Sequence, residues 1–533
     1  MKKFRKRFLQ VTPVLLLSFV LLKLLYGLPD VFDLSVADEA FYLNSARTGV
    51  LRADGFLYLL WLRGLLGVMD PISAYYTNLI VLIIFFSIAA FLWFRVSSGS
   101  TSVGLILAVL MTVSTMNTVG WPYITRLSAA ILMLAATGIS IVQKPDSRFM
   151  IAMPAALILS YIRPEFAMAG MLFGAFALYY SWRNRKAEPK SSLVLAIVSA
   201  GLLLLLIVVS PVDHSRSMVA FSQHYALDLH EIGMWPEEPW ATGNQLMERD
   251  FPGASSFVEA MVTNPAAVIG HVWRNALRLP FEIIEAVRPY WLTGIFWKFL
   301  IALSFTGLML RLLLMLRPTR EWKKDITRLT EGGILLLFLL PLIVSILIIY
   351  PRQHYLIMIL PIVVGFGVWR LKLPVSRQVG VGVGVGAAAV IFSLFFAYWM
   401  PWTANLRPGF RFPSSVQSSH GAGLCTLRDR VDALNLLKKE RSFTLLSPLG
   451  MLQPYLNEGW TEILHYAKST SFLEFLARES ITAIWVNSDL MNDVRFRDDD
   501  QFKTFLLHPP AGWRKVGVSG CSEQYLLILE PFL

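Results

Sequence analysis

The sequence predicts a mainly α-helical protein that crosses a membrane many times and ends in a small soluble α/β domain. Of its 533 residues, 55% are hydrophobic and only 16% are charged, whereas about 25% are charged in an average globular protein. Long apolar runs recur through the first 400 residues and then stop. We therefore divide the chain into a transmembrane part, residues 1–400, and a soluble domain, residues 401–533.

Eleven apolar runs predict about eleven transmembrane helices. A lone spanning helix needs roughly 20 apolar residues, but a helix buried among others can be shorter because its neighbours satisfy the backbone. The predicted spans are Phe8–Leu28, Ala74–Phe94, Val103–Val119, Leu127–Val142, Phe149–Tyr161, Phe166–Tyr180, Leu193–Val209, Tyr290–Leu316, Ile334–Tyr350, Tyr355–Trp369 and Val379–Met400.

The basic segment MKKFRKR opens the chain. We interpret the run after it as a span and not as a cleaved signal, because Lys23 interrupts it and no small-residue cleavage site follows. With eleven spans, the segments predicted to lie on the same side of the membrane as the N-terminus hold many more basic than acidic residues, which is typical of cytoplasmic loops. We therefore expect a cytoplasmic N-terminus, outer loops at residues 29–73 and 210–289, and an outward-facing soluble domain.

The net charge of +12 fits this orientation and contact with anionic membrane lipids. It does not indicate a nucleic-acid partner, because no basic patch interleaved with aromatic residues lies in the soluble part. We expect a bacterial cytoplasmic membrane protein whose C-terminal domain is periplasmic or extracellular.

The soluble domain holds 14 basic and 14 acidic residues, as a water-exposed surface requires. FTLLSPLG, ITAIWVNSDL and EQYLLILEPF are typical of short buried strands, and LRDRVDALNLLKKE and TSFLEFLARES of amphipathic helices. Both cysteines of the chain, Cys425 and Cys521, fall in this domain. A disulfide between them and two separate buried thiols are both open.

An acidic pair stands just after the first span, in SVADEAFYLNSA from Ser35 to Ala46. Ser35 and Asp38 have the spacing of a capping box at a helix start. Asp38 and Glu39 would then lie in the first helical turn, where the helix dipole favours negative charge. This structural role is compatible with a chemical one, because a helix start holds a carboxylate rigidly.

The motif DEAFYLNSA resembles the first outer loop of the GT-C class of membrane glycosyltransferases, especially the protein O-mannosyltransferases and the aminoarabinose transferase of lipid A. RADGFLYLLWLRGL, with Asp54, is similar to the second element of that loop. YIRPEF, with Arg163, and YPRQHYLIMILP, with Arg352 and His354, look like basic elements at the outer ends of later spans. The chain departs from the family in its shorter first loop and in lacking a Lys-Pro-Pro element after Asp54.

The resemblance implies transfer of a sugar from a polyprenyl-phosphate donor to a hydroxyl of a glycan, lipid or protein acceptor, with inversion at the anomeric carbon. It implies Asp38 as the general base, with Glu39 beside it in the catalytic motif. Such a base contributes typically about 10²–10⁴-fold to the rate. Exposure of the first loop to the cytosol would contradict the role of Asp38 as the base.

The departing lipid phosphate needs cations at the membrane surface, and guanidinium groups suit this task. The candidates are Arg163, Arg352, Arg126 in WPYITRLSA, and His354. Each has a structural alternative: a snorkelling arginine, an ion pair of Arg163 with Glu165, or an interfacial histidine. A divalent metal held by Asp54 and Glu39, with help from His354, also stays open.

The alternative function is a membrane transporter or a flippase for lipid-linked glycans. Such proteins usually contain internal repeats with broken helices near the midplane. The sequence has no two-fold hydropathy repeat, and its acidic residues gather outside the spans. Aromatic and acidic residues of the second loop, between His224 and Trp240, fit either acceptor binding or an interfacial belt.

Overall fold

The structure is a computed structural model, and the description that follows covers most of the chain. The described residues are 2–34, 38–50, 52, 55–118, 123–210, 214–237, 239–291, 326–369, 398–403, 427–437, 442–447, 452–463, 471–491, 496, 499–518, 521 and 524–530.

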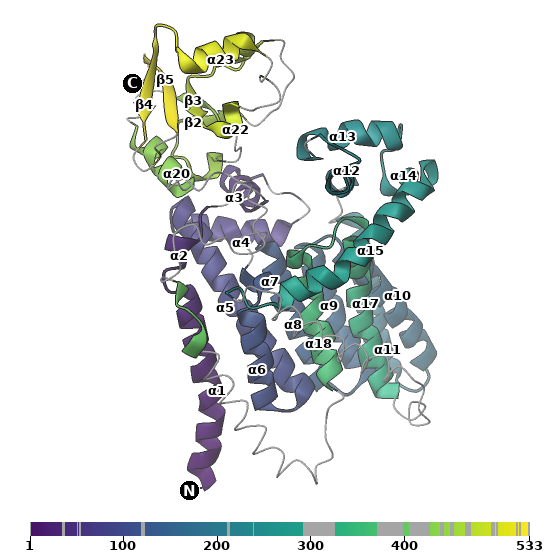
Figure 1. Cartoon of the computed structure of the whole chain (residues 1–533). Helices are drawn as coiled ribbons and strands as arrows, with labels where there is room; N and C mark the ends of the chain where they lie inside the picture. The colour runs from purple at the N-terminus through teal and green to yellow at the C-terminus, as the bar shows by residue number, and fades with distance from the viewer. Residues whose placement is uncertain are drawn as a thin grey trace.

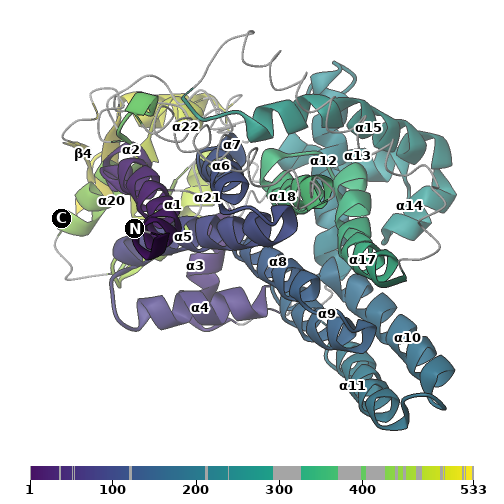
Figure 2. The ribbon, with the colours of Figure 1, turned by 90° about the horizontal axis from the view of Figure 1, so that it is seen from below.

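The first part of the chain is a bundle of helices with the N-terminus at one end and the C-terminal domain at the other (Figure 1). Seen from below, α9, α10 and α11 lie along an edge of the bundle away from α1 (Figure 2). The helices are α1 Lys2–Leu25, α5 Pro71–Ser98, α6 Thr101–Thr112, α8 Ile124–Ile141, α9 Pro145–Ser160, α10 Phe166–Asn184, α11 Pro189–Val208, α17 Ile326–Ile348 and α18 Gln353–Trp369.

Local sequence signals explain where the long helix α5 begins and ends. Asp70 precedes it, and its Oδ1 accepts hydrogen bonds from the backbone N–H groups of Ile72 and Ser73, each 3.0 Å away. Pro71 occupies the first helical position, where its missing N–H is not needed. Gly99 ends the helix in the left-handed conformation, with a φ of 67°, which glycine adopts without a steric cost.

Four helical segments in the described part are long and apolar enough to cross a membrane: Pro71–Ser98, Ile124–Ile141, Pro189–Val208 and Glu331–Ile348. Nine of the eleven predicted spans coincide with helices, although some of these are too short or too polar to cross alone. The other two predicted spans, Tyr290–Leu316 and Val379–Met400, lie mostly outside the described residues. These helices indicate a membrane protein, while the number of spans stays a prediction.

Two predicted spans are shorter in the structure than in the sequence analysis. The first ends at Leu25, and Gly27, with a φ of 76°, separates it from the short α2, Leu28–Val31. The third ends at Thr112 and is followed by α7, Thr115–Thr118. This second break has a structural cause, because the Thr115 N–H donates to the Arg288 carbonyl at 2.7 Å and not to its own helix.

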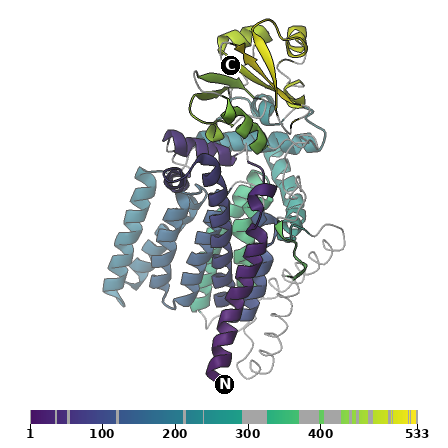
Figure 3. The ribbon, with the colours of Figure 1, turned by 90° about the vertical axis from the view of Figure 1, so that its left-hand side faces the viewer.

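The segments predicted to face outward gather at one end of the bundle. Helices α3, Asp38–Thr48, and α4, Phe56–Leu66, lie across that end beneath the C-terminal domain (Figures 1 and 3). Beside them stand the helices of the second predicted loop (Figure 1). These are α12 His214–Glu231, α13 Pro239–Asp250, α14 Phe257–Thr263 and α15 Pro265–Val287.

Helix α15, which contains the segment NPAAVIGHVWRNALRLP, is amphipathic. Its apolar side chains at four-residue spacing are exposed, and its polar face is turned to the protein. Such an unpartnered apolar stripe suits a helix that lies along a membrane surface. The stripe consists of Ile269, Trp273, Leu277 and Phe281.

The C-terminal domain is built on a five-stranded sheet in the order β2-β1-β3-β5-β4. The first three strands in this order are parallel, and β5 pairs antiparallel with both β3 and β4. The predicted strands and helices correspond to β1, β3, β5, α20 and α21. The elements are α20 Leu427–Leu436, β1 Phe443–Leu446, η3 Gln453–Tyr455, β2 Trp460–Ile463, α21 Phe472–Arg478, β3 Ala483–Val486, α22 Ser488–Met491, α23 Asp500–Leu507, β4 Trp513–Gly517 and β5 Tyr525–Leu529.

Polar contacts fasten this domain to the end of the bundle. The carboxylate of Asp33 accepts from the first two backbone N–H groups of α20, with the Leu427 nitrogen 2.6 Å from Oδ2, and so caps that helix from a distant part of the chain. Thr403 Oγ1 donates to the Leu24 carbonyl at 2.7 Å. Cys521 is buried and disulfide-bonded, whereas Cys425, the other cysteine of the chain, lies outside the described residues.

Candidate functional site

The acidic pair lies at the start of α3, in its first turn, as predicted. Ser35, the predicted cap, is outside the described residues. Neighbouring in sequence, the two carboxylates lie in opposite environments: Asp38 is exposed, whereas Glu39 is only 2% exposed. The carboxylate of Asp38 makes no hydrogen bond or ion pair with any other described residue, so it is free to act on a molecule arriving from outside.

Glu39 is held by neutral donors. Tyr58 Oη donates to Glu39 Oε2 at 2.6 Å, and the backbone N–H of Tyr123 donates to Oε1. Asn78 Nδ2 in turn donates to Tyr58 Oη at 2.6 Å. Burial raises the pKa of Glu39 to about 7, although the hydrogen bonds from Tyr58 and Tyr123 act in the opposite direction. Glu39 is therefore an internal group and not one that a substrate meets directly.

A cluster of tyrosines surrounds Glu39. The hydroxyl of Tyr123 donates to that of Tyr75 at 2.7 Å. The ring of Tyr75 lies 5.2 Å from that of Tyr76 and 5.8 Å from that of Tyr455, both edge-on. Because Tyr455 belongs to the C-terminal domain, this domain contributes a side chain to the interior around the acidic pair.

Arg126, at the start of α8, is buried within electrostatic range of Glu39. Its Nε and Nη2 donate to the Asn117 carbonyl at 2.9 and 2.6 Å, and its guanidinium lies 4.9 Å from the centre of the Tyr123 ring. Arg126 is thus committed to protein partners, and the structure favours a positioning role over direct contact with a phosphate.

Arg163 forms the local ion pair that the sequence offered as an alternative. Its Nη2 and Nε contact the carboxylate of Glu165, and its guanidinium lies 5.2 Å from the centre of the Tyr355 ring. Burial opposes the charge of Arg163, but the Glu165 carboxylate more than compensates and keeps its pKa above the ordinary value. Tyr355 is within electrostatic range of Asp38, which places this pair near the exposed acid.

Arg352 is the least committed of the predicted phosphate ligands. Its guanidinium lies 5.1 Å from the centre of the Trp240 ring and 5.8 Å from that of Tyr350. The guanidinium makes no hydrogen bond or ion pair within the described part of the chain, although the backbone carbonyl of Arg352 accepts from the N–H groups of Tyr355 and Leu356. His354 packs on Tyr355, with ring centres 4.2 Å apart, and lies within electrostatic range of the three candidate arginines.

The structure thus brings six of the seven predicted site residues to one end of the bundle: Asp38, Glu39, Arg126, Arg163, Arg352 and His354. They come from helices α3, α8 and α18, from the turn between α9 and α10 and, for Arg352, from the turn between α17 and α18. The seventh, Asp54, lies outside the described residues.

The predicted metal site stays a prediction. Among the described residues, no three His, Cys, Asp or Glu side chains are placed to hold a metal ion. Each oxygen of Glu39 already accepts a hydrogen bond from the protein, which makes this carboxylate a poor ligand in the present arrangement. We therefore assign no step of the chemistry to a metal.

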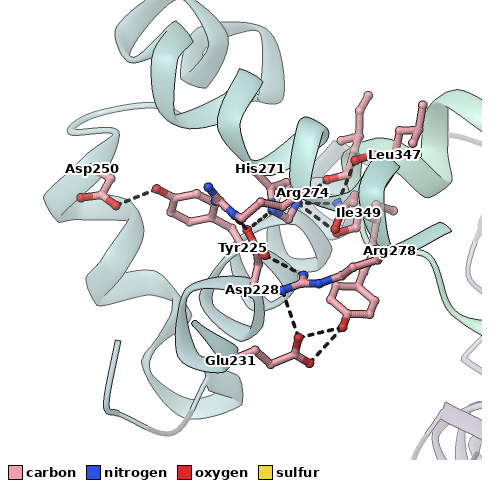
Figure 4. Close-up of polar contacts among 12 residues, drawn as sticks. Tyr225, Asp228, Glu231, Asp250, His271, Arg274, Arg278, Leu347 and Ile349 are labelled. Atoms are coloured by element: carbon pink, nitrogen blue, oxygen red, sulfur yellow. Dashed lines mark hydrogen bonds and ion pairs between the residues drawn. The ribbon is translucent and has the colours of Figure 1, made fainter. Parts of the chain in front are cut away.

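A second polar cluster, which the sequence analysis did not identify, lies between helices α12 and α15 of the second loop (Figure 4). At its centre is Asp228, which is fully buried. Its Oδ2 lies 2.9 Å from His271 Nδ1 and 2.7 Å from Arg274 Nη2, and its Oδ1 lies 2.6 Å from Arg278 Nη1. Burial alone would raise the pKa of Asp228, but the hydrogen bonds from His271 and Arg274 lower it below its ordinary value.

This cluster holds the turn that leads to Arg352. His271 Nε2 lies 2.9 Å from the Ile348 carbonyl, and Asn275 Nδ2 donates to the Leu347 carbonyl at 2.8 Å. These carbonyls end α17 and have no partner within the helix. Arg278 also pairs with Glu231, which accepts from Tyr350 Oη at 2.9 Å. The second loop therefore helps to position the chain just before Arg352.

A spacing in the sequence indicates this cluster. His271, Arg274, Asn275 and Arg278 stand at intervals of three, four and seven residues, which places them on one face of a helix. No spacing indicates their partner, because Asp228 lies on a different helix.

Comparisons with known proteins do not identify a family: no family model and no curated protein matches the chain.

Proposed function

We propose that this protein is an integral-membrane glycosyltransferase of the GT-C type. It would move a sugar from a polyprenyl-phosphate donor to a hydroxyl of a glycan, lipid or protein on the outer face of a bacterial cytoplasmic membrane. The proposal is carried by one arrangement: a free, exposed carboxylate, Asp38, stands at the same end of an apolar bundle as several cationic side chains. Lipid, phosphate and acceptor would meet at this end.

Each residue has a definite role in the proposed reaction. Asp38 accepts the proton of the acceptor hydroxyl as its oxygen attacks the anomeric carbon of the sugar. The bond from that carbon to the phosphate oxygen breaks, its electrons pass to the lipid phosphate, and the sugar is transferred with inversion. Arg352, whose guanidinium lies over the rings of Trp240 and Tyr350 and makes no ion pair in the described part, would stabilise the departing phosphate.

Arg163, His354 and Arg126 surround this position. Arg163 is held by Glu165 and by the Tyr355 ring, so it adds positive charge without leaving its place. Arg126 fixes the Asn117 carbonyl and the Tyr123 ring and thereby supports the backbone N–H that binds Glu39. The bundle of apolar helices would hold the polyprenyl chain.

The first experiment is an Asp38→Asn variant expressed in a strain from which the gene is deleted. We expect transfer to fall about 10²–10⁴-fold, with normal membrane insertion and an unchanged melting temperature. Mass spectrometry of the cell-envelope glycans identifies the sugar that is lost and measures its return.

Asp70→Asn is the matched control. It also replaces a carboxylate beside a helix start on the outer side, and asparagine caps a helix as well as aspartate does. Full transfer by a folded Asp38→Asn protein would contradict the proposal.

A further inference from the structure

A cavity of about 620 Å³ lies between the first outer loop and the C-terminal domain. Ala46 and Arg47 of α3 and Arg63 and Gly67 of α4 line one side, and the segment Tyr455–Glu458 lines the other. These helices lie between the bundle and the domain (Figure 3). Ligand sites are commonly cavities of roughly 300–1,000 Å³, and they occur preferentially where domains meet.

Polar contacts fix the walls of this cavity. Arg47 Nη1 donates to the carbonyls of Gln453, Pro454 and Leu456 at 3.1, 3.1 and 2.6 Å. This one guanidinium therefore binds the segment of the C-terminal domain that faces α3. Asn457 is held through its backbone N–H, which donates to Asn435 Oδ1 at 2.8 Å. The opening is thus part of the folded structure.

The lining offers uncommitted polar groups of several kinds. The side chain of Arg63 is exposed and makes no hydrogen bond or ion pair with the rest of the described chain. The side chains of Asn457 and Glu458 are also exposed. These side chains present hydrogen-bond donors and acceptors, and Tyr455, which is only 2% exposed, adds an aromatic residue to the wall. The rest of the lining is mostly apolar, from Ala46, Leu66, Met69, Pro71 and Leu456. Such a mixture of polar groups and apolar surface suits a saccharide, whose hydroxyl groups surround apolar ring faces.

The cavity is connected to the acidic pair in two ways. Helix α3 carries Asp38 at its start and Ala46 near its end, and eight residues of helix span about 12 Å. Tyr455, which lines the cavity, contacts the ring of Tyr75. The Tyr75 hydroxyl accepts a hydrogen bond from the hydroxyl of Tyr123, and the backbone N–H of Tyr123 donates to Glu39. A ligand in the cavity therefore lies beside the site and does not block Asp38.

We propose that this cavity binds the part of a saccharide acceptor that is remote from the reacting hydroxyl. This inference rests on the proposed function and narrows it to an acceptor longer than a single sugar ring. The distance along α3 separates the cavity from the base, so one end of the acceptor would be held by Arg63 and its neighbours while the other reaches Asp38.

Gly67 provides a direct test, because a side chain there can fill the cavity without straining the backbone. Its φ is −72°, and an added Cβ would meet nothing closer than the Gly64 carbonyl oxygen at 3.5 Å. We expect Gly67→Trp to reduce the transferred sugar in cell-envelope glycans at least tenfold in the deletion strain, whereas Gly67→Ala stays near wild type.

Gly64→Trp is the matched control. Gly64 lies one turn earlier on α4, outside the cavity, and a Cβ there meets no atom within 4 Å. We expect this variant to transfer sugar normally. Arg63→Ala is a second, milder probe of the lining and should lower transfer about tenfold at normal melting temperature.

The outcomes separate this inference from the proposed function. Normal transfer by a folded Gly67→Trp protein, or equal losses in Gly67→Trp and Gly64→Trp, would overturn the acceptor cavity while a dead Asp38→Asn variant still supports the transferase. Should Gly67→Trp misfold, Arg63→Ala decides: normal transfer overturns the cavity, and a tenfold loss supports it. Full transfer by Asp38→Asn would remove the basis of both.

Discussion

Two fully buried carboxylates stand at the same end of the bundle and are stabilised in opposite ways. Asp228 contacts a histidine and two arginines, which lower its pKa. Glu39 receives hydrogen bonds from a tyrosine hydroxyl and a backbone N–H, and burial raises its pKa to about 7. The comparison teaches that burial alone does not decide the charge of an acid. The charge also depends on whether the groups that donate hydrogen bonds to the carboxylate are neutral or cationic. Asp228 acts as a fixed anion, whereas Glu39 can exchange its proton near neutral pH.

Removing the fixed anion should have the largest effect on stability. Asp228→Ala leaves three cationic or polar partners without their shared acceptor, and breaking a buried ionic cluster in this way costs about 3–5 kcal/mol. The melting temperature of the purified protein in detergent should fall accordingly. Arg249→Ala, which breaks the more exposed pair with Asp250, should cost less than about 1 kcal/mol. Equal melting temperatures for both variants would refute the distinction.

The protonation of Glu39 should appear as a pH dependence of stability. Its pKa rises from an ordinary 4.5 to about 7 on folding, so the folded protein holds this proton more tightly than the unfolded chain. The resulting stabilisation is complete below about pH 4.5 and is lost as the pH rises through about 7. At roughly 1.4 kcal/mol per pH unit, the loss amounts to about 3 kcal/mol.

Glu39→Gln isolates this contribution, since glutamine has a similar shape and does not titrate. The difference in melting temperature between the wild type and this variant should change between pH 4.5 and 7 in favour of the wild type at low pH. Other groups, such as Glu462, titrate in the same range but cancel in the difference. A difference that does not vary with pH would show that Glu39 keeps one charge throughout.

Tyr58→Phe should have a smaller effect on stability than the changes at Asp228 and Glu39. It removes the hydroxyl that donates to Glu39 and accepts from Asn78, and leaving buried polar groups unsatisfied costs about 1–3 kcal/mol. Because this hydrogen bond lowers the pKa of Glu39, its loss should also move the pH-dependent range upward. A pH profile of the melting temperature that matches the wild type would contradict this coupling.

Much of the fold is predictable from the sequence where apolar residues form unbroken runs. The helices of the bundle belong to this class, and so do β3 and β5, whose central residues are buried. Strands β2 and β4 escaped prediction because their side chains are partly exposed, with burial that alternates or is incomplete. Edge strands of this kind bury too little apolar surface to leave a clear pattern.

Single residues of the candidate site could be predicted from the sequence, but their contacts could not. Charged side chains near the ends of apolar spans are costly and conspicuous, so Arg126, Arg163 and His354 could be singled out. What each one contacts depends on tertiary structure, so the hydrogen bond of Arg126 to the Asn117 carbonyl and the position of Arg352 over the rings of Trp240 and Tyr350 could not be foreseen. The tyrosines around Glu39 carry no local signal, because they come from separate helices and from the C-terminal domain.

The position of Tyr455 in the chain has a consequence for biogenesis. This residue reaches the interior near α3 only after more than four-fifths of the 533 residues have been synthesised. The helices of the bundle are synthesised before it, but the enclosure around the acidic pair closes only when this last part of the chain docks. A ribosome-bound or truncated polypeptide would therefore contain the bundle and yet lack the closed enclosure.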